Sequence, residues 1–132
     1  MKQSFYLFTS LGAAFISIVA GLAYYTFTGE NLISANEAKK MLKNKHIKYV
    51  VDVRTQTEYN LGHYKNAINF PIGSMNTKNI KEFEIKNKIN KNDGILVYCN
   101  TGQRARNAAE KLKNYGFKNL YYIAGPHISI QN

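Results

Sequence analysis

Short apolar runs alternate with longer amphipathic stretches along the chain after residue 30. The runs are rich in β-branched and aromatic residues, a composition typical of buried strands. We expect strands at 32–33, 49–53, 67–70, 95–98 and 120–123. Apolar positions at helical spacing predict helices at 34–44, 55–62, 75–89 and about 105–115. Strands that alternate with helices predict an α/β fold, with a mostly parallel sheet flanked by helices.

Two of these helices carry start signals, and the last one carries a stop signal. Ser34 and Glu37 have the spacing of a capping box, in which each side chain bonds the backbone of the other residue, and Thr55 and Glu58 repeat it. Gly116 follows the last helix at the position where glycine commonly ends a helix.

The N-terminal segment has a different composition from the rest of the chain. Apart from tyrosines, it contains no ionisable side chain between Gln3 and Gly29, and about 20 apolar residues are enough to cross a bilayer as a helix. We therefore expect an N-terminal hydrophobic helix in residues 1–29, serving as a membrane anchor, and a separate domain in residues 30–132. A cleaved signal peptide is the alternative, because Gly21-Leu22-Ala23 resembles a cleavage site.

The expected topology is a single membrane pass through residues 4–28. More lysines follow this segment than precede it, which by the positive-inside rule slightly favours a cytoplasmic C-terminal domain. The lysines that follow are Lys39, Lys40, Lys43 and Lys45, against Lys2 before the segment. If the segment is a cleaved signal peptide, the domain is exported instead.

Charge and cysteine content narrow the function classes. The chain has 18 Lys and Arg against 8 Asp and Glu, a net charge of +10, which favours anionic partners. No motif for base stacking or groove binding accompanies this charge, so we expect no nucleic-acid partner. One cysteine and three histidines exclude an internal disulfide and predict that there is no metal site.

The segment from Cys99 to Arg104 is the strongest candidate for chemistry. It connects the expected strand 95–98 to a helix, and ligand sites in parallel sheets lie beyond the carboxyl ends of the strands. Asp52 and Arg54 end another strand on the same rim. We expect these two residues to pair and to hold the rim of the site in shape rather than to act directly in catalysis.

A cysteine at the start of such a loop is expected to be reactive. Successive amides of a strand-to-helix loop can point inward and bind an anion, which stabilises the thiolate, the nucleophilic form of the side chain. Gly102 supplies backbone freedom, and its missing side chain leaves room for a substrate. Arg104 can offer a planar pair of donors to an oxyanion. The alternative is that Cys99 is an inert buried residue.

Three blocks of the sequence resemble the single-domain rhodaneses. They are VVDVRTQTEYNLGHYKNAINFPI at 50–72, ILVYCNTGQRARNAAEKLKNYGF at 95–117, and residues 120–125. The resemblance covers nearly all of residues 32–126 and includes the pattern C-x-x-G-x-R at the start of an alanine-rich helix. It implies a rhodanese-like fold with a five-stranded parallel sheet.

The resemblance also implies a sulfurtransferase activity. A sulfane sulfur would pass from a small anionic donor such as thiosulfate to a thiophilic acceptor, which is a small molecule or a protein thiol. Cys99 matches the catalytic cysteine that carries the sulfur as a persulfide, and no cofactor is implied. The residues that match the family's substrate loop are Asn100, Thr101, Gly102, Gln103 and Arg104.

Two other function classes compete with this interpretation. Cysteine phosphatases commonly place an arginine six positions after the nucleophile, where this chain has Ala105, so we do not favour them. A non-enzymatic docking or sulfur-carrier module at the membrane is the second hypothesis. It is motivated by the C-terminal end, which lacks the tryptophan-bearing helix usual in the family, so that one wall over the core is expected either to be thin or to be covered by Ile128 and Ile130. Asn66 stands where the family often has glycine, and asparagine tolerates a positive φ.

Overall fold

The structure, a computed structural model, describes residues 31–132. The predicted N-terminal helix in residues 1–29, the proposed membrane segment 4–28 and the boundary before residue 30 lie outside the described residues. Within residues 31–132, no helix is long and apolar enough to span a bilayer.

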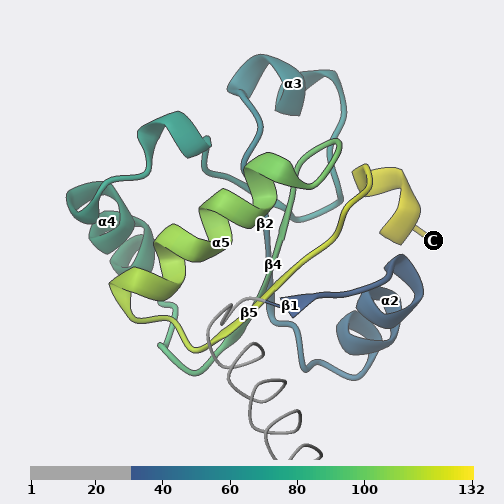
Figure 1. The fold of residues 1–132 in the computed structure, drawn as a ribbon, viewed down its shortest axis with the longest axis horizontal. Coiled ribbons are helices and arrows are strands. Elements are labelled where there is room, and N and C mark those ends of the chain that lie inside the picture. Colours follow the sequence, from purple (N-terminus) through teal and green to yellow (C-terminus); the bar gives the residue numbers. More distant parts are fainter. Residues whose placement is uncertain (1–30) are drawn as a thin grey trace, which may run out of the picture.

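A five-stranded sheet forms the centre of the domain (Figure 1). All neighbouring strands are parallel, and their order is β1-β5-β4-β2-β3. The strands are β1 Asn31–Leu32, β2 Tyr49–Asp52, β3 Ile68–Asn69, β4 Gly94–Tyr98 and β5 Asn119–Tyr122. The predicted α/β class and the five-stranded sheet are confirmed, and each strand end lies within one residue of the predicted end.

Helices cover both faces of this sheet. Their bounds are α2 Ala35–Lys43, α3 Gln56–Leu61, α4 Thr77–Asn87 and α5 Gln103–Tyr115, with short 3-10 helices η1 Ile72–Ser74 and η2 His127–Ile130. In Figure 1, α4 and α5 lie on one side of the sheet, and α2 and the C-terminal segment lie on the other. The helix expected at 75–89 is shorter than predicted, because Asn76 caps it by accepting a hydrogen bond from the Asn79 amide.

The alternation of side chains along β4 divides the hydrophobic core into two clusters. Ile95 and Val97 point towards α4 and α5, in one cluster with Leu112. Leu96 and Tyr98 point to the opposite face, in a second cluster with Ala38 of α2. Every residue of β4 is buried. A central parallel strand is a continuous apolar run because both of its faces are buried in this way.

The predicted helix signals are present in the structure, except that only one of the two hydrogen bonds predicted for the capping box of Ser34 and Glu37 is formed. Thr55 and Glu58 form a complete capping box at α3, while Ser34 at α2 accepts a hydrogen bond from the Glu37 amide. Gly116 ends α5 with φ 130°. Asn66 has φ 69°, so the left-handed turn survives without a glycine.

The C-terminal segment covers one face of the core with a single isoleucine. Ile130 is 2% exposed and belongs to the second cluster, beside α2. Ile128 is 70% exposed, so the expectation that both residues cover the core is wrong for Ile128. The reason is geometric, because two positions apart on a 3-10 helix point in different directions.

Candidate functional site

The candidate site lies at the point where the strand order reverses. After β2 the chain moves outward to β3, whereas β4 lies on the other side of β2 and leads outward to β5. A crevice at the carboxyl ends of β2 and β4 is therefore the expected ligand site of this sheet. Cys99 follows β4 directly, and Arg54 follows β2 by two residues.

Cys99 is buried, and its sulfur accepts hydrogen bonds from the loop that follows. The side chain is 1% exposed. The Gly102 amide donates to Sγ at 3.1 Å, and the Ala105 amide donates at 3.4 Å. Ala105 belongs to the first turn of α5, whose amides have no partner within the helix. The sulfur therefore acts as the capping acceptor of α5, in a position where backbone dipoles favour negative charge.

Gly102 gives this loop the backbone freedom that was expected, but its missing side chain does not leave room for a substrate. It adopts φ 96°, and a Cβ on it would lie 2.8 Å from the Cα of Ala124 and 3.4 Å from the carbonyl oxygen of Ile123. The space left by the missing side chain is thus filled by the backbone after β5. Sequence reasoning assigned that space to a substrate.

The other loop residues present backbone donors and exposed side chains. Asn100, Thr101 and Gln103 are exposed. The amides of Gln103 and Arg104, the first two of α5, find no acceptor among residues 31–132. They are available to an anionic atom placed beyond the sulfur of Cys99.

Arg104 is held by a carboxylate from α3. Its Nη1 lies 2.8 Å from Oε2 of Glu58, and its Nη2 lies 3.2 Å from Oε1. The hydrogen bond from Arg104 lowers the pKa of Glu58 to about 2, and the hydrogen bond to Glu58 raises the pKa of Arg104. The paired donors that the sequence suggested for an oxyanion are occupied by Glu58 in this structure.

Asp52 and Arg54 form a buried ion pair on the rim. Asp52 is 0% exposed and Arg54 is 6% exposed. Nη2 of Arg54 lies 2.7 Å from the Asp52 carboxylate and 2.6 Å from the carbonyl oxygen of Gly62. The structure brings these residues together, and their contacts stabilise the rim of the site by linking β2 to the turn after α3.

Tyr98 completes this buried network. Its hydroxyl donates to Asp52 at 2.7 Å and accepts a hydrogen bond from the Tyr64 amide at 3.0 Å. Burial and the bond to Asp52 raise the pKa of Tyr98. Since Tyr98 immediately precedes Cys99, the network fixes the strand end from which the Cys99 loop starts.

Comparison with known proteins shows the family to which the chain belongs. The rhodanese-like domain family matches residues 34–125. The chain belongs to the rhodanese-like family. The tRNA uridine(34) hydroxylase of Buchnera aphidicola is 40% identical over 95 residues, which cover 70% of this chain and 29% of that protein. The chain thus spans less than a third of the length of the curated relatives that it matches.

Solved structures show the same rhodanese-like fold. The human single-domain sulfurtransferase TSTD1 has a TM-score of 0.60 and 20% identity, covering 74% of this chain and 92% of that chain. The rhodanese-like domain of the Anabaena protein Alr3790 has a TM-score of 0.60 and 22% identity, covering 75% of this chain and 71% of that chain. At these identities the likeness shows the fold alone.

Sequence reasoning missed two residues beside the site of this rhodanese-like domain. Glu58 was assigned only to a helix cap, because its pairing with Arg104 joins positions 46 residues apart. His127 carried no signal, yet the structure places its ring 5.9 Å from the ring of Tyr98 and close to Gly62. Its Nδ1 is buried with no hydrogen-bond partner among residues 31–132.

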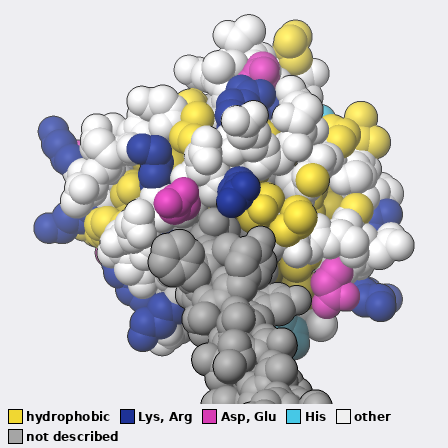
Figure 2. Space-filling model, in the orientation of Figure 1, with side chains coloured by type: hydrophobic (Ala, Val, Ile, Leu, Met, Phe, Trp, Pro, Cys, Tyr) yellow, Lys and Arg dark blue, Asp and Glu magenta, His cyan; other side chains and the backbone are white. Residues whose placement is uncertain are grey.

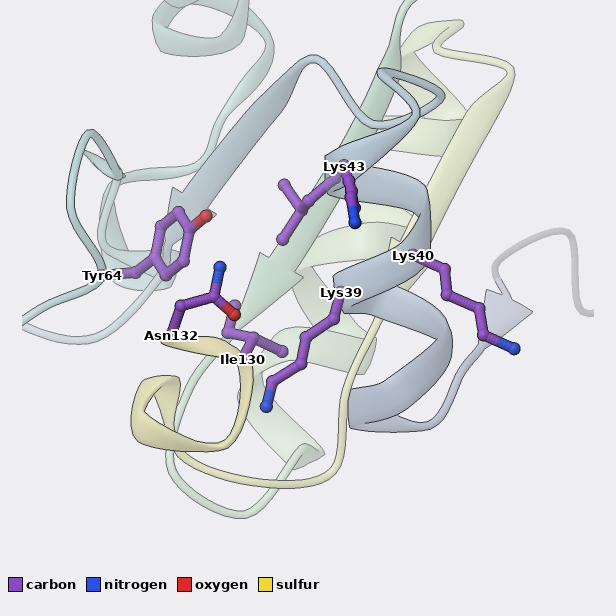
Figure 3. A pocket seen from close by; sticks show the side chains of 7 residues that line it. Lys39, Lys40, Lys43, Tyr64, Ile130 and Asn132 are labelled. Carbon is purple, nitrogen blue, oxygen red and sulfur yellow. The ribbon is translucent and has the colours of Figure 1, made fainter.

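A pocket elsewhere on the rhodanese-like domain contains none of the loop residues. It has a volume of about 480 Å³ and lies between α2 and the C-terminal segment (Figure 3). Its lining is Lys39, Lys40, Leu42, Lys43, Tyr64, Ile130 and Asn132. No group of three or more potential metal ligands comes together within residues 31–132. The amide-lined cysteine loop is therefore the candidate site.

Proposed function

We propose that this rhodanese-like protein transfers sulfane sulfur through a persulfide on Cys99. The observation that carries the proposal is the sulfur of Cys99 at the end of β4, which accepts two backbone N–H groups of its own loop. Such donors stabilise the attacking thiolate and, after transfer, the negative charge on the outer sulfur. The unpartnered amides of Gln103 and Arg104 are the donors available to that outer sulfur.

The reaction takes place in two displacement steps. The Cys99 thiolate attacks the outer sulfur of a donor such as thiosulfate, a sulfur–sulfur bond forms, and the donor's own sulfur–sulfur bond breaks, so that sulfite leaves with the electron pair. A thiophilic acceptor then attacks the outer sulfur of the persulfide, takes it, and returns the thiolate of Cys99. Two separate steps of this kind give ping-pong kinetics.

Mass spectrometry of the full chain tests the proposal. Incubation with thiosulfate is expected to add one sulfur atom to the intact protein, and an added thiol acceptor is expected to remove it. Because the chain has one cysteine, the adduct reports on Cys99 alone. Cys99→Ser is expected to abolish both loading and turnover while its circular dichroism stays that of the native fold. Sulfur transfer that persists in Cys99→Ser would refute the persulfide.

A sulfur-carrier or docking module at the membrane is the non-enzymatic alternative. It is supported by the C-terminal segment, where Ile130 is the one buried residue of η2. A carrier loads sulfur but passes it efficiently only to a protein thiol, and a docking module does not load at all. The loading experiment, followed by transfer to small and protein thiols, separates these cases from an enzyme.

Action on tRNA is a second candidate function. It is supported by the 40% identity to a tRNA uridine(34) hydroxylase and by the net charge of +10. Basic side chains are dispersed over the face seen in Figure 2, with acidic ones between them. Incubation with tRNA and an added two-electron oxidant, followed by nucleoside mass spectrometry, tests this candidate, because hydroxylation is a two-electron oxidation that adds one oxygen atom to uridine. A hydroxylated nucleoside would overturn the expectation that the protein has no nucleic-acid partner.

The membrane tether also remains a proposal, supported by the sequence of residues 4–28. We place the rhodanese-like domain on the cytoplasmic side, with export after signal cleavage as the alternative. Membrane fractionation, protease accessibility and N-terminal sequencing of the mature protein distinguish the two. A full-length protein in the membrane fraction supports the tether, and a shortened, exported protein contradicts it.

A further inference from the structure

The ion pair between Glu58 and Arg104 places a negative charge beside the guanidinium of the reactive loop. Both contacts of the pair are short, at 2.8 and 3.2 Å. The Glu58 carboxylate also accepts the Thr55 amide at 3.0 Å, so the start of α3 fixes it in place. The side chains are 36% exposed for Arg104 and 33% exposed for Glu58, and a solute that reaches the loop therefore meets the pair rather than an isolated cation.

This pairing affects donors according to their charge. A donor anion must approach the Cys99 thiolate, which repels it, and a nearby guanidinium offsets that repulsion. Glu58 cancels much of the guanidinium's field, and it also occupies the two nitrogens that would bind an oxyanion. The repulsion that remains acts twice as strongly on a dianion as on a monoanion at the same distance.

We propose that Glu58 is a positioning residue, and that by positioning Arg104 it makes the site select sulfur donors by their charge. By holding Arg104, it disfavours dianions such as thiosulfate and favours donors with a single negative charge, the chemical class of alkyl persulfides and thiosulfonates. This inference rests on the proposed sulfur transfer and specifies its substrate class.

Thiosulfate and methanethiosulfonate form a matched pair of probes. In methanethiosulfonate a methyl group replaces one charged oxygen, so the two donors are close in shape and differ by one charge. The chemistry is otherwise the same, because the Cys99 thiolate takes the outer sulfur from either donor. Sulfite leaves in one case, and methanesulfinate leaves with the electron pair in the other.

Glu58→Gln removes the charge and keeps the helix start. Glutamine is the alternative residue of a capping box, so α3 is expected to remain capped. We expect the second-order rate constant for loading from thiosulfate to rise by about fivefold, the effect of one partly exposed charge pair. The rate constant for methanethiosulfonate is expected to rise less, so that the ratio of the two increases. Glu110→Gln, which makes the same charge change on the exposed face of α5, is expected to leave the ratio unchanged.

A double-mutant cycle tests whether Glu58 acts through Arg104. In an Arg104→Gln background, Glu58→Gln is expected to change the donor ratio by a smaller factor than in the wild type, because no guanidinium nitrogens are left to release and only the repulsion by the carboxylate itself is removed. A purely structural role for Glu58 would change both donors equally and would persist in that background.

The outcomes separate this inference from the proposed function. If both donors load Cys99 but Glu58→Gln leaves their ratio at the wild-type value, Glu58 does not select donor charge, and sulfur transfer stands. If neither donor loads the wild-type full chain, the proposed function fails and this inference fails with it.

Discussion

Tyr98 and Cys99 are neighbours in the chain, but their side chains serve opposite faces of the sheet. Cys99 lies in the cluster with α5, and Tyr98 lies in the cluster with α2. The Tyr98 hydroxyl is tied to Asp52, while the Cys99 sulfur is tied to its own loop. The period of two along a strand thus separates a structural anchor from the proposed nucleophile at adjacent positions.

Gly102 is the residue of the loop that tolerates substitution least. Gly102→Ala forces a Cβ to within 2.8 Å of the Ala124 backbone at φ 96°, and such strain costs about 1–3 kcal/mol. We expect lower stability in urea and slower loading of Cys99, since the amide that donates to its sulfur must move.

Gly73→Ala is the matched control for this substitution. A Cβ on Gly73 meets nothing within 4 Å, so its urea midpoint and loading rate are expected to match those of the wild type. A Gly102→Ala variant that loads as fast as Gly73→Ala would show that the curl of the loop is not needed.

At the scale of elements, local signals in the sequence account for most of the fold. All five strands were predicted from short apolar runs, and Thr55 and Gly116 marked helix ends that the structure confirms. The start of α4 was missed, because the apolar positions suggested a helix from Met75, whereas Asn76 caps α4 and the helix begins at Thr77, two residues later. The 3-10 turn at Ile72–Ser74 has no apolar period and could not be predicted from patterning.

Sequence analysis could predict the parts of the candidate site that are formed by residues adjacent in the sequence. It could not predict the contacts between residues that are far apart in the sequence. Cys99 and its loop follow from a strand-to-helix junction that is local in sequence. The partner of Arg104 and the bond from Tyr98 to Asp52 each span 46 residues. Such pairings arise only when the sheet brings β2, β4 and α3 together, and a single sequence contains no local signal for them.

Asp52 of β2 accepts hydrogen bonds from Arg54 on the rim and from Tyr98 of β4, and its charge is expected to matter for stability. Asp52→Asn leaves the buried Arg54 guanidinium without its counter-charge. Breaking a buried pair in this way costs about 3–5 kcal/mol, so the urea midpoint is expected to fall sharply.

Asp93→Asn is the control for the loss of a carboxylate. Asp93 lies 3.9 Å from Lys48, whose side chain is 57% exposed, and such a pair contributes about 0–1 kcal/mol. Equal losses of stability in the two variants would contradict the conclusion that the Asp52–Arg54 pair stabilises the rim of the site.

At the scale of the whole molecule, the C-terminal segment ties the last strand back to the site. After β5, Ala124 packs against Gly102, and His127 lies beside the Tyr98 ring. Ile130 then inserts beside α2. The segment therefore contacts the Cys99 loop, the buried ion-pair network and the second core cluster in turn, so that a change in its docking reaches the candidate site.

His127 makes this docking sensitive to pH. Burial, together with the nearby Arg54 charge, lowers the pKa of His127 in the folded protein below 6.5. Between that lowered pKa and 6.5 the unfolded chain binds more protons at this position, so stability rises with pH. The contribution is fully present above about pH 6.5 and is lost as the pH falls towards the folded pKa.

Urea unfolding at pH 7.5 and 5.5 is expected to show a smaller fall in midpoint for His127→Gln than for the wild type. His46→Gln changes an exposed histidine and is expected to keep the wild-type fall. If His127→Gln keeps it as well, the neutral imidazole does not contribute to the docking of the C-terminal segment.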